Sequence, residues 1–203
     1  MTFSIITKEY PLILASASPR RKSLLTQSGL PFRSVKSHIN EDDVHGDSAY
    51  LSLVLAKKKA SDVKSGCQNM WILGADTIVV TNNEILGKPQ DSEQATRMLN
   101  VLSGREHKVI TGFCILDPSG EVSHSEAVET LVRIKTLGSR EIAGYVKTGE
   151  PYGKAGSYAI QGIGSFMIEG IAGSYTNVVG LPLCALIKAL VSRGAIHGFP
   201  LWP

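Results

Sequence analysis

The sequence contains few cysteines, and their spacing does not suit disulfide or metal chemistry. Its 203 residues include Cys67, Cys114 and Cys184, an odd number at wide intervals with no CxxC pair. A disulfide framework normally uses an even set of cysteines, and a zinc site normally uses ligands paired at short spacing. The pattern therefore argues against both a disulfide framework and a zinc site.

Long hydrophobic runs are also missing from the sequence. The apolar stretch near the amino terminus, within MTFSIITKEYPLILASAS, is interrupted by polar residues. It is too short for a membrane span or a signal peptide. We therefore expect a cytoplasmic protein with no membrane partner. The sequence leaves the oligomeric state open, and a homodimer is compatible with it.

The sequence has no strong excess of either charge. It holds 21 Lys and Arg against 18 Asp and Glu, a formal net charge of +3. Domains that bind nucleic acid usually carry a strongly basic face, so this charge by itself does not indicate such a partner. Basic residues instead gather at 20–22 and 57–59, two spots that could meet one compact anion.

Strand and helix patterns alternate along the chain. A hydrophobic fraction of 43% is enough for a sizeable core at this length. This alternation predicts one mixed α/β domain over residues 1–203, with a central twisted sheet flanked by helices. Strands are expected at 12–15, 32–35, 71–81, 84–86, 108–116, 122–134 and 165–169, and helices at 19–28, from 47 or 48 onward, 92–102, 140–147 (capped by Ser139) and 182–192.

The segment 16–21, Ser-Ala-Ser-Pro-Arg-Arg, lies where the first strand gives way to a helix. Ser18 supplies an N-cap and Pro19 suits the first helical position. Backbone N–H groups, two hydroxyls and two guanidinium groups would converge at the positive end of the helix dipole, an arrangement that suits phosphate. The alternative is an ordinary capped helix with a solvated basic first turn, although arginine is unfavourable there unless it faces an anion.

Asp76 is an acid inside an otherwise apolar strand. A buried carboxylate is costly without a partner or a metal ion, which suggests a functional role. Such a group could polarise a water, or hold the metal that does so, for attack on phosphorus. The alternative is an acid at the exposed end of the strand, hydrogen-bonded to a neighbouring loop.

Four further positions are weaker candidates. Of the three lysines at 57–59, at most one or two can point into a shared cleft, and the first two are expected in solvent. Lys88 could aim its ammonium at a phosphate oxygen from the fixed loop Gly-Lys-Pro, or lie in a plain turn. Glu41 opens an acidic run that could supply a metal ligand or form a solvated loop. Gln161 lies in a glycine-rich segment that suits close approach to a flat ligand, and equally suits a turn.

Five ordered segments together resemble the Maf family of nucleotide pyrophosphatases. They are ASASPRR at 15–21, LGADT at 73–77, GKP at 87–89, GKAGSYAIQG at 153–162 and NVVGLPL at 177–183. The resemblance implies a mixed α/β fold of two lobes with a cleft, similar to inosine triphosphate pyrophosphatases. It also implies hydrolysis of a nucleoside triphosphate between its α and β phosphates, with Mg²⁺ or Mn²⁺ as the divalent cation.

The resemblance also implies roles for single residues. Asp76 would be the catalytic base, and Glu41 would lie near the metal. The phosphates would be contacted by Ser16, Arg20, Arg21, Lys59 and Lys88.

Within the family, one branch resembles enzymes that act on dTTP and UTP, and another resembles enzymes that act on 7-methyl-GTP. The sequence matches the first branch at Arg20, Thr77 and Gln161. The carboxamide of Gln161 can pair with uracil or thymine, with support from Thr77. A flipped amide would pair with cytosine, so Gln161 alone does not exclude CTP.

The main hypothesis is therefore a nucleoside triphosphate diphosphatase, a hydrolase of acid anhydrides, which acts on dTTP, UTP and modified pyrimidine nucleotides. Two alternatives stay open. One is a regulator without catalysis that binds nucleic acid or a division protein, because family members have been linked to septum formation. The other is a house-cleaning pyrophosphatase directed at purines. The tail HGFPLWP matches no motif of the family.

Overall fold

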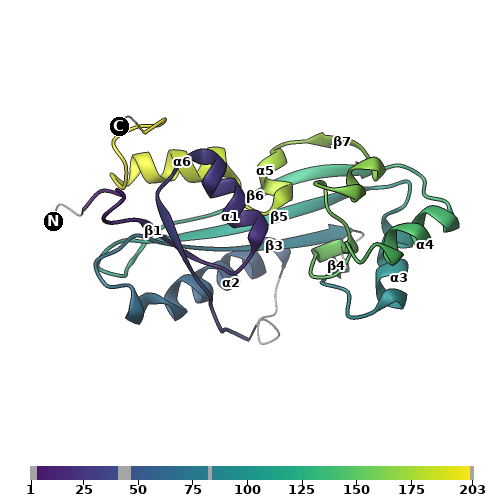
Figure 1. Cartoon of the computed structure of the whole chain (residues 1–203), viewed down its shortest axis with the longest axis horizontal. Coiled ribbons are helices and arrows are strands. Elements are labelled where there is room, and N and C mark those ends of the chain that lie inside the picture. The colour runs from purple at the N-terminus through teal and green to yellow at the C-terminus, as the bar shows by residue number, and fades with distance from the viewer. Residues whose placement is uncertain (1–3, 41–46, 82–83, 202–203) are drawn as a thin grey trace. The chain divides into compact units, whose positions relative to one another are not determined.

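The structure is a computed structural model that describes residues 4–40, 47–81 and 84–201 (Figure 1). One mixed sheet runs through it in the order β2-β1-β3-β5-β6-β7, with β4 paired to β3. The strands are β1 (Leu12–Ala15), β2 (Phe32–Val35), β3 (Ile72–Thr81), β4 (Glu84–Leu86), β5 (Glu106–Leu116), β6 (Val122–Ile134) and β7 (Ile168–Ala172). The α-helices are α1 (Pro19–Ser28), α2 (Ser48–Asp62), α3 (Ser92–Leu102), α4 (Ser139–Lys147), α5 (Tyr175–Val179) and α6 (Leu183–Ser192), and the short 3₁₀ helices are η1 (Lys64–Gly66), η2 (Ala155–Ser157) and η3 (Ile163–Met167).

The chain divides into two compact units. Unit 1 comprises the residues up to Asp76, Thr111–Val128 and the residues from Gly180 onward. Unit 2 comprises Thr77–Ile110 and Glu129–Val179. Strands β3, β5 and β6 each contribute residues to both units.

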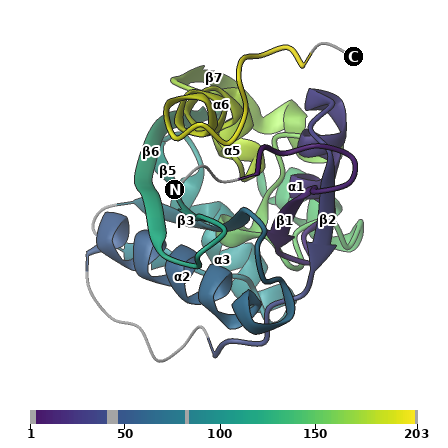
Figure 2. The ribbon, with the colours of Figure 1, turned by 90° about the vertical axis from the view of Figure 1, so that its left-hand side faces the viewer.

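Unit 1 is organised around β1, which is parallel to both of its neighbours. Leu12 pairs with Phe32 of β2, and Ile13 pairs with Ile72 of β3. Strands β2 and β3 therefore lie on opposite sides of β1, and the two connections run in opposite directions across the sheet. Because both crossovers are right-handed, the connecting helices α1 and α2 lie on opposite faces of the sheet. Figure 1 shows α1 above these strands and α2 below them, and Figure 2 shows β1 and β2 side by side next to α1.

Helix α2 packs on the strands at backbone distance. A Cβ atom on Gly74 would lie 2.0 Å from the carbonyl oxygen of Ala56, and one on Gly112 would lie 2.5 Å from the carbonyl carbon of Ser52. Any larger residue at either position would push the helix away. The two glycines therefore set how close the buried face of α2 comes to β3 and β5.

Unit 2 has its own apolar core. In it β4 is antiparallel to β3, and β7 is antiparallel to β6. Helix α3 begins at the N-cap Asp91, whose side chain accepts a hydrogen bond from Gln94 N, and its apolar face is strongly segregated. The core includes Leu86, Met98, Leu99, Leu102, Val132, Ile134, Ile142, Tyr145 and Met167.

The expected mixed α/β fold, with a central sheet flanked by helices, is confirmed. Three local predictions were wrong or incomplete. Residues 165–167, which were expected to begin the last strand, belong to η3, and β7 begins at Ile168. Ser139 is the first residue of α4, and Gly138 occupies the cap position. Helix α5 was not anticipated.

Candidate functional site

The loop between β1 and α1 is fixed by its own hydroxyl groups. The Ser18 side chain accepts a hydrogen bond from Arg21 N (3.5 Å), and Pro19 takes the first helical position. Ser18 N donates to Ser16 Oγ at 3.2 Å, while the Ser34 hydroxyl donates to Ser16 O at 2.6 Å. The loop therefore holds its shape at the N-terminus of α1, where backbone N–H groups favour an anion.

Arg21 is buried and held at two points. Its Nε donates to Gly180 O at 2.8 Å, and its Nη1 donates to Ser16 Oγ at 3.3 Å. Ser16 Oγ accepts hydrogen bonds from Ser18 N and from Arg21 Nη1, so this hydroxyl can still donate its own hydrogen to an acceptor. Arg20 precedes Arg21 and is half-buried. Arginines in the first turn are opposed by the helix dipole, and a bound anion would remove that cost.

Lys59 and Asp76 form a buried ion pair within unit 1. Lys59 Nζ lies 2.6 Å from Asp76 Oδ1, and each residue is only 8% exposed. Lys59 belongs to the buried face of α2, whereas Lys57 and Lys58 lie in solvent as expected. A charge pair removed from water in this way depends on both partners, because loss of either leaves the other charge buried alone.

The β1–α1 loop and Asp76 lie at the same edge of the sheet. Strands β1 and β3 are parallel neighbours with Leu14 opposite Leu73, and Ser16 and Asp76 follow two and three residues later. The chain turns to β2 on one side of β1 and to β3 on the other, so the β1–β3 boundary is a topological switch point. Open α/β sheets bind ligands outside the carboxyl ends of their strands at such points.

In unit 2, a backbone hydrogen bond joins the loop that carries Lys88 to the glycine-rich segment that carries Gln161. Lys88 is exposed in the loop after β4, and the neighbouring Gly87 O accepts a hydrogen bond from Gly156 N at 3.1 Å. Gly156 has φ +71°, and a Cβ there would lie 2.9 Å from Val79 Cγ1, so only glycine fits. Gln161 follows in the same glycine-rich segment and is half-buried.

Thr77 directly follows Asp76 in β3 and is half-buried. Successive side chains of a strand point to opposite faces, so Thr77 and Asp76 face opposite sides of β3.

The candidate metal ligands are only partly described. Glu41 lies outside the residues that the structure describes. Within residues 4–40, 47–81 and 84–201, no three His, Cys, Asp or Glu side chains gather as a metal-binding group. Mg²⁺ commonly takes one or two protein carboxylates and completes its shell with water and substrate phosphates. Asp76 is compatible with that minimal type of site.

Two polar clusters in unit 2 have no counterpart in the sequence analysis. The first centres on Glu150, whose carboxylate accepts hydrogen bonds from Ile163 N (3.0 Å) and Gly164 N (2.8 Å). Partial burial works to raise the pKa of Glu150, but hydrogen bonds from these two N–H groups and from the Tyr145 hydroxyl outweigh it and lower that pKa. The glycine-dense segment predicted a loop, but no local pattern pointed to Glu150 as its partner.

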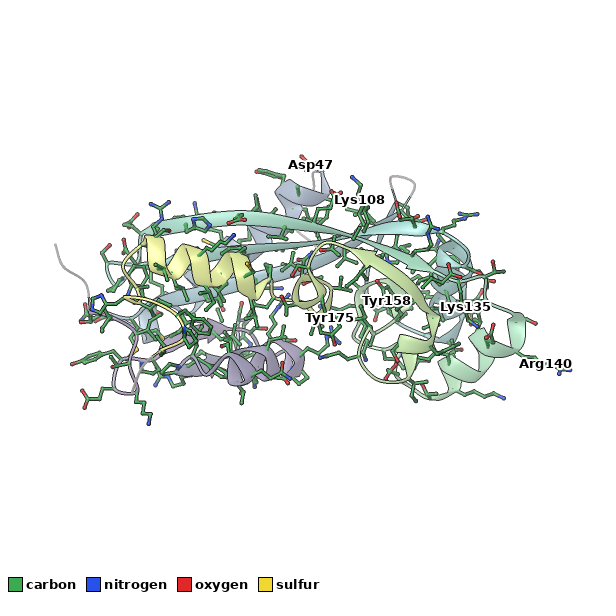
Figure 3. The ribbon with its side chains drawn as sticks, turned by 90° about the horizontal axis from the view of Figure 1, so that it is seen from above. Asp47, Lys108, Lys135, Arg140, Tyr158 and Tyr175 are labelled. Atoms are coloured by element: carbon green, nitrogen blue, oxygen red, sulfur yellow. The ribbon has the colours of Figure 1, made fainter. Side chains whose placement is uncertain are left out.

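The second cluster joins His107 to Tyr158. His107 Nε2 lies 2.7 Å from the Tyr158 hydroxyl, and the two rings meet edge to face. Burial lowers the pKa of His107 to about 4 and raises the pKa of Tyr158, so both groups are neutral at physiological pH. Figure 3 shows Tyr158 among the side chains of the interior of unit 2.

Residues 11–193 match the model of the Maf-like protein family. The chain belongs to the Maf family. The resemblance of the five sequence motifs is thereby confirmed. The tail at 197–203 lies outside the matched range.

Several Maf-family relatives carry the name dTTP/UTP pyrophosphatase. The protein of that name from Syntrophotalea carbinolica is 47% identical over 93% of this chain and 87% of its own. The one from Ruminiclostridium cellulolyticum is 49% identical over 85% of this chain and 90% of its own, and the one from Geotalea uraniireducens is 48% identical over 92% and 96%.

Among solved structures, a nucleoside-triphosphatase described as a dITP/XTP pyrophosphatase, from Mycobacterium abscessus, aligns with a TM-score of 0.38 and 14% identity. That alignment covers 61% of this chain and 72% of the other. None of the helices in the described part of the chain is long and apolar enough to cross a membrane.

Proposed function

We propose that the chain hydrolyses dTTP and UTP to the monophosphate and pyrophosphate. The observation that carries this proposal is the buried Lys59–Asp76 pair at the same sheet edge as the Ser16–Arg21 loop. The names of relatives 47–49% identical over most of the chain support the choice of substrates. Modified pyrimidine nucleotides belong to the same proposal.

The triphosphate is bound by the basic groups in this proposal. The N-terminus of α1 and the Ser16 hydroxyl donate hydrogen bonds to phosphate oxygens, and Arg20 and Arg21 supply guanidinium groups suited to two oxygens at once. Lys59 and Lys88 add positive charge. These groups neutralise the charge that accumulates on the departing pyrophosphate.

Asp76 acts as the general base. One of its carboxylate oxygens is engaged by Lys59, which orients the group. The carboxylate accepts a proton from a water whose oxygen bonds to the α phosphorus, while the bond from that phosphorus to the bridging oxygen of pyrophosphate breaks. The reaction needs no covalent intermediate.

A divalent cation, Mg²⁺ or Mn²⁺, belongs to the proposal. Asp76 and Glu41 are the residues that would hold it, together with phosphate oxygens of the substrate. When bound, such a cation supplies charge neutralisation and lowers the pKa of a bound water.

The base is read by Gln161 in unit 2. Its carboxamide accepts a hydrogen bond from the ring N3–H of uracil or thymine and donates one to a neighbouring carbonyl. Thr77 supports the pairing.

The decisive test is replacement of Asp76 by asparagine. Asparagine keeps the shape of the side chain but cannot accept the proton, so we expect turnover of UTP to fall by roughly 10²- to 10⁴-fold. Release of pyrophosphate is measured with and without Mg²⁺ or Mn²⁺. Asp62→Asn, which changes an exposed acid of α2, is the control and should keep full activity. A folded Asp76→Asn protein with only a severalfold loss would rule out the general-base role.

The same assay separates the two alternatives. A panel of pyrimidine and purine nucleoside triphosphates distinguishes a dTTP/UTP enzyme from a purine-directed one. A regulator without catalysis would release no pyrophosphate, and it would bind duplex DNA with a steep salt dependence that Asp76→Asn leaves unchanged.

A further inference from the structure

We infer that Glu150 is a positioning residue that sets the base selectivity of the site, because it holds the backbone that carries Gln161. The inference rests on the proposed function, since it takes Gln161 to be the residue that contacts the base. It concerns unit 2 alone.

On the carboxyl-terminal side of Gln161, the backbone folds directly onto Glu150. The Glu150 carboxylate accepts hydrogen bonds from the N–H groups of Ile163 and Gly164, which lie two and three residues after Gln161. The intervening Gly162 has φ +80°, and a Cβ atom there would lie 2.2 Å from Glu150 Oε1. The segment therefore presses against the carboxylate at three successive residues.

On the amino-terminal side of Gln161, a second contact leads back to the same carboxylate. Ala159, two residues before Gln161, donates its N–H to the Tyr145 hydroxyl at 3.2 Å. That hydroxyl in turn hydrogen-bonds to the side chain of Glu150. Tyr145 is 2% exposed, so the bridge is shielded from competing water. One carboxylate thus fixes the chain on both sides of Gln161.

Base selectivity depends on this fixation for a chemical reason. The two ends of the Gln161 carboxamide are nearly the same shape, but one donates and the other accepts hydrogen bonds. The orientation that suits uracil is wrong for cytosine, and a loop free to shift lets the amide turn to suit either base. A rigid backbone around Gln161 keeps the carboxamide in one orientation. The base that does not match this orientation leaves polar groups of the site unpaired, and this cost discriminates against it.

Glu150→Gln is the direct test. A neutral carboxamide offers one oxygen and one NH₂ group, and the NH₂ group would face an N–H donor, so the loop loses at least one of its two backbone contacts. We expect the ratio of kcat/KM for UTP over CTP to fall by about 10-fold. The loss for UTP should lie mainly in KM, because the groups proposed to act on the phosphates are unchanged.

The controls separate failure of this inference from failure of the proposed function. Glu169→Gln removes the same charge from an exposed position on β7 and should leave the ratio unchanged. Gln161→Ala tests the proposed function: if it does not alter the ranking of bases, Gln161 does not read the base. If Gln161→Ala removes the ranking but Glu150→Gln changes the ratio by less than about twofold, the inference about Glu150 is wrong.

A purely structural role for Glu150 predicts a different result. It would lower the melting temperature and reduce kcat/KM equally for all bases, and that outcome also overturns the inference. If Glu150→Gln does not fold, Tyr145→Phe decides the question, because it breaks the bridge to Ala159 without changing any charge. The same fall in the ratio of UTP over CTP is expected from it, and an unchanged ratio would contradict the inference.

Discussion

At the scale of single residues, the two arginines of the β1–α1 loop differ in how deeply they are buried. From the sequence, both were expected to contact phosphate, because both follow Pro19. Arg21 is buried and donates to Gly180 O and Ser16 Oγ, whereas Arg20 is half-buried. Arg21 therefore shapes the loop in addition to any contact with phosphate.

This difference predicts unequal effects of lysine at the two positions. A lysine ammonium is a single nitrogen and cannot reproduce the planar fork that reaches two acceptors, so Arg21→Lys leaves buried Gly180 O without its donor. We expect Arg21→Lys to lower the free energy of unfolding by about 1–3 kcal/mol, measured in urea, and to reduce pyrophosphate release. Arg20→Lys, at a half-buried position, should reduce pyrophosphate release with a smaller change in the urea midpoint. Equal urea midpoints for the two variants would refute the distinction.

Residues could be predicted from the sequence where they break a local pattern. Asp76 was singled out because an acid interrupts an apolar strand, and the loop at 16–21 was singled out because arginines occupy a helix N-terminus. Glu150 and His107 break no such pattern. Their partners lie 13, 14 and 51 residues away, at Ile163, Gly164 and Tyr158, and such contacts are created by folding alone.

At the scale of elements, most boundaries followed from capping residues and periodicity. Helix α1 runs from Pro19 to Ser28 as predicted, because Ser18 and Gly29 mark its two ends locally. Residues 165–167 were predicted as the start of a strand but belong to η3. The carboxylate of Glu150 accepts hydrogen bonds from the N–H groups of the first two residues of η3 and so stabilises a helical turn. This contact is long-range, and local propensity does not predict it.

The close packing of α2 predicts a specific effect of a methyl group. In Gly74→Ala the new Cβ would meet the backbone of Ala56, which cannot move without shifting α2 and with it Lys59. We expect a loss of stability of about 1–3 kcal/mol, the usual cost of overpacking, measured by urea unfolding. Pyrophosphate release at a temperature where the variant is folded should also fall, because Lys59 no longer meets Asp76.

Gly66→Ala is the matched control for this variant. Gly66 lies in η1, just after α2, and a Cβ there would meet no atom within 4 Å. Its stability and activity should equal those of the unchanged chain. If Gly74→Ala had the same stability and activity as the unchanged chain, a methyl group would fit between β3 and α2, and Gly74 would not set the position of α2.

At the scale of the whole molecule, burial of His107 couples stability to pH. The unfolded imidazole takes up a proton near its ordinary pKa of 6.5, whereas the folded one does so only at about 4. Between these values the unfolded state binds more protons, so the free energy of unfolding falls as the pH is lowered. The slope contributed by one group reaches at most about 1.4 kcal/mol per pH unit. Above pH 6.5 this contribution is complete and constant.

Urea unfolding at pH 7.5 and pH 5.0 measures this coupling. The double variant His107→Leu with Tyr158→Phe replaces both polar partners with apolar groups, so it removes the titration without leaving a buried hydroxyl unpaired. We expect it to lose less stability than the unchanged chain between the two pH values. An identical loss in both proteins would show that other groups dominate the acid sensitivity.

The hydrogen bond from Arg21 to Gly180 bears on the order in which the protein is made. Its two residues are separated by 159 positions, so a ribosome has produced most of the chain before the acceptor exists. Contacts of such long range close late and slow the folding of the segments that depend on them. A nascent chain would carry β1 and α1 long before Gly180 emerges to anchor Arg21. The loop that we expect to bind the triphosphate is therefore synthesised early and completed late.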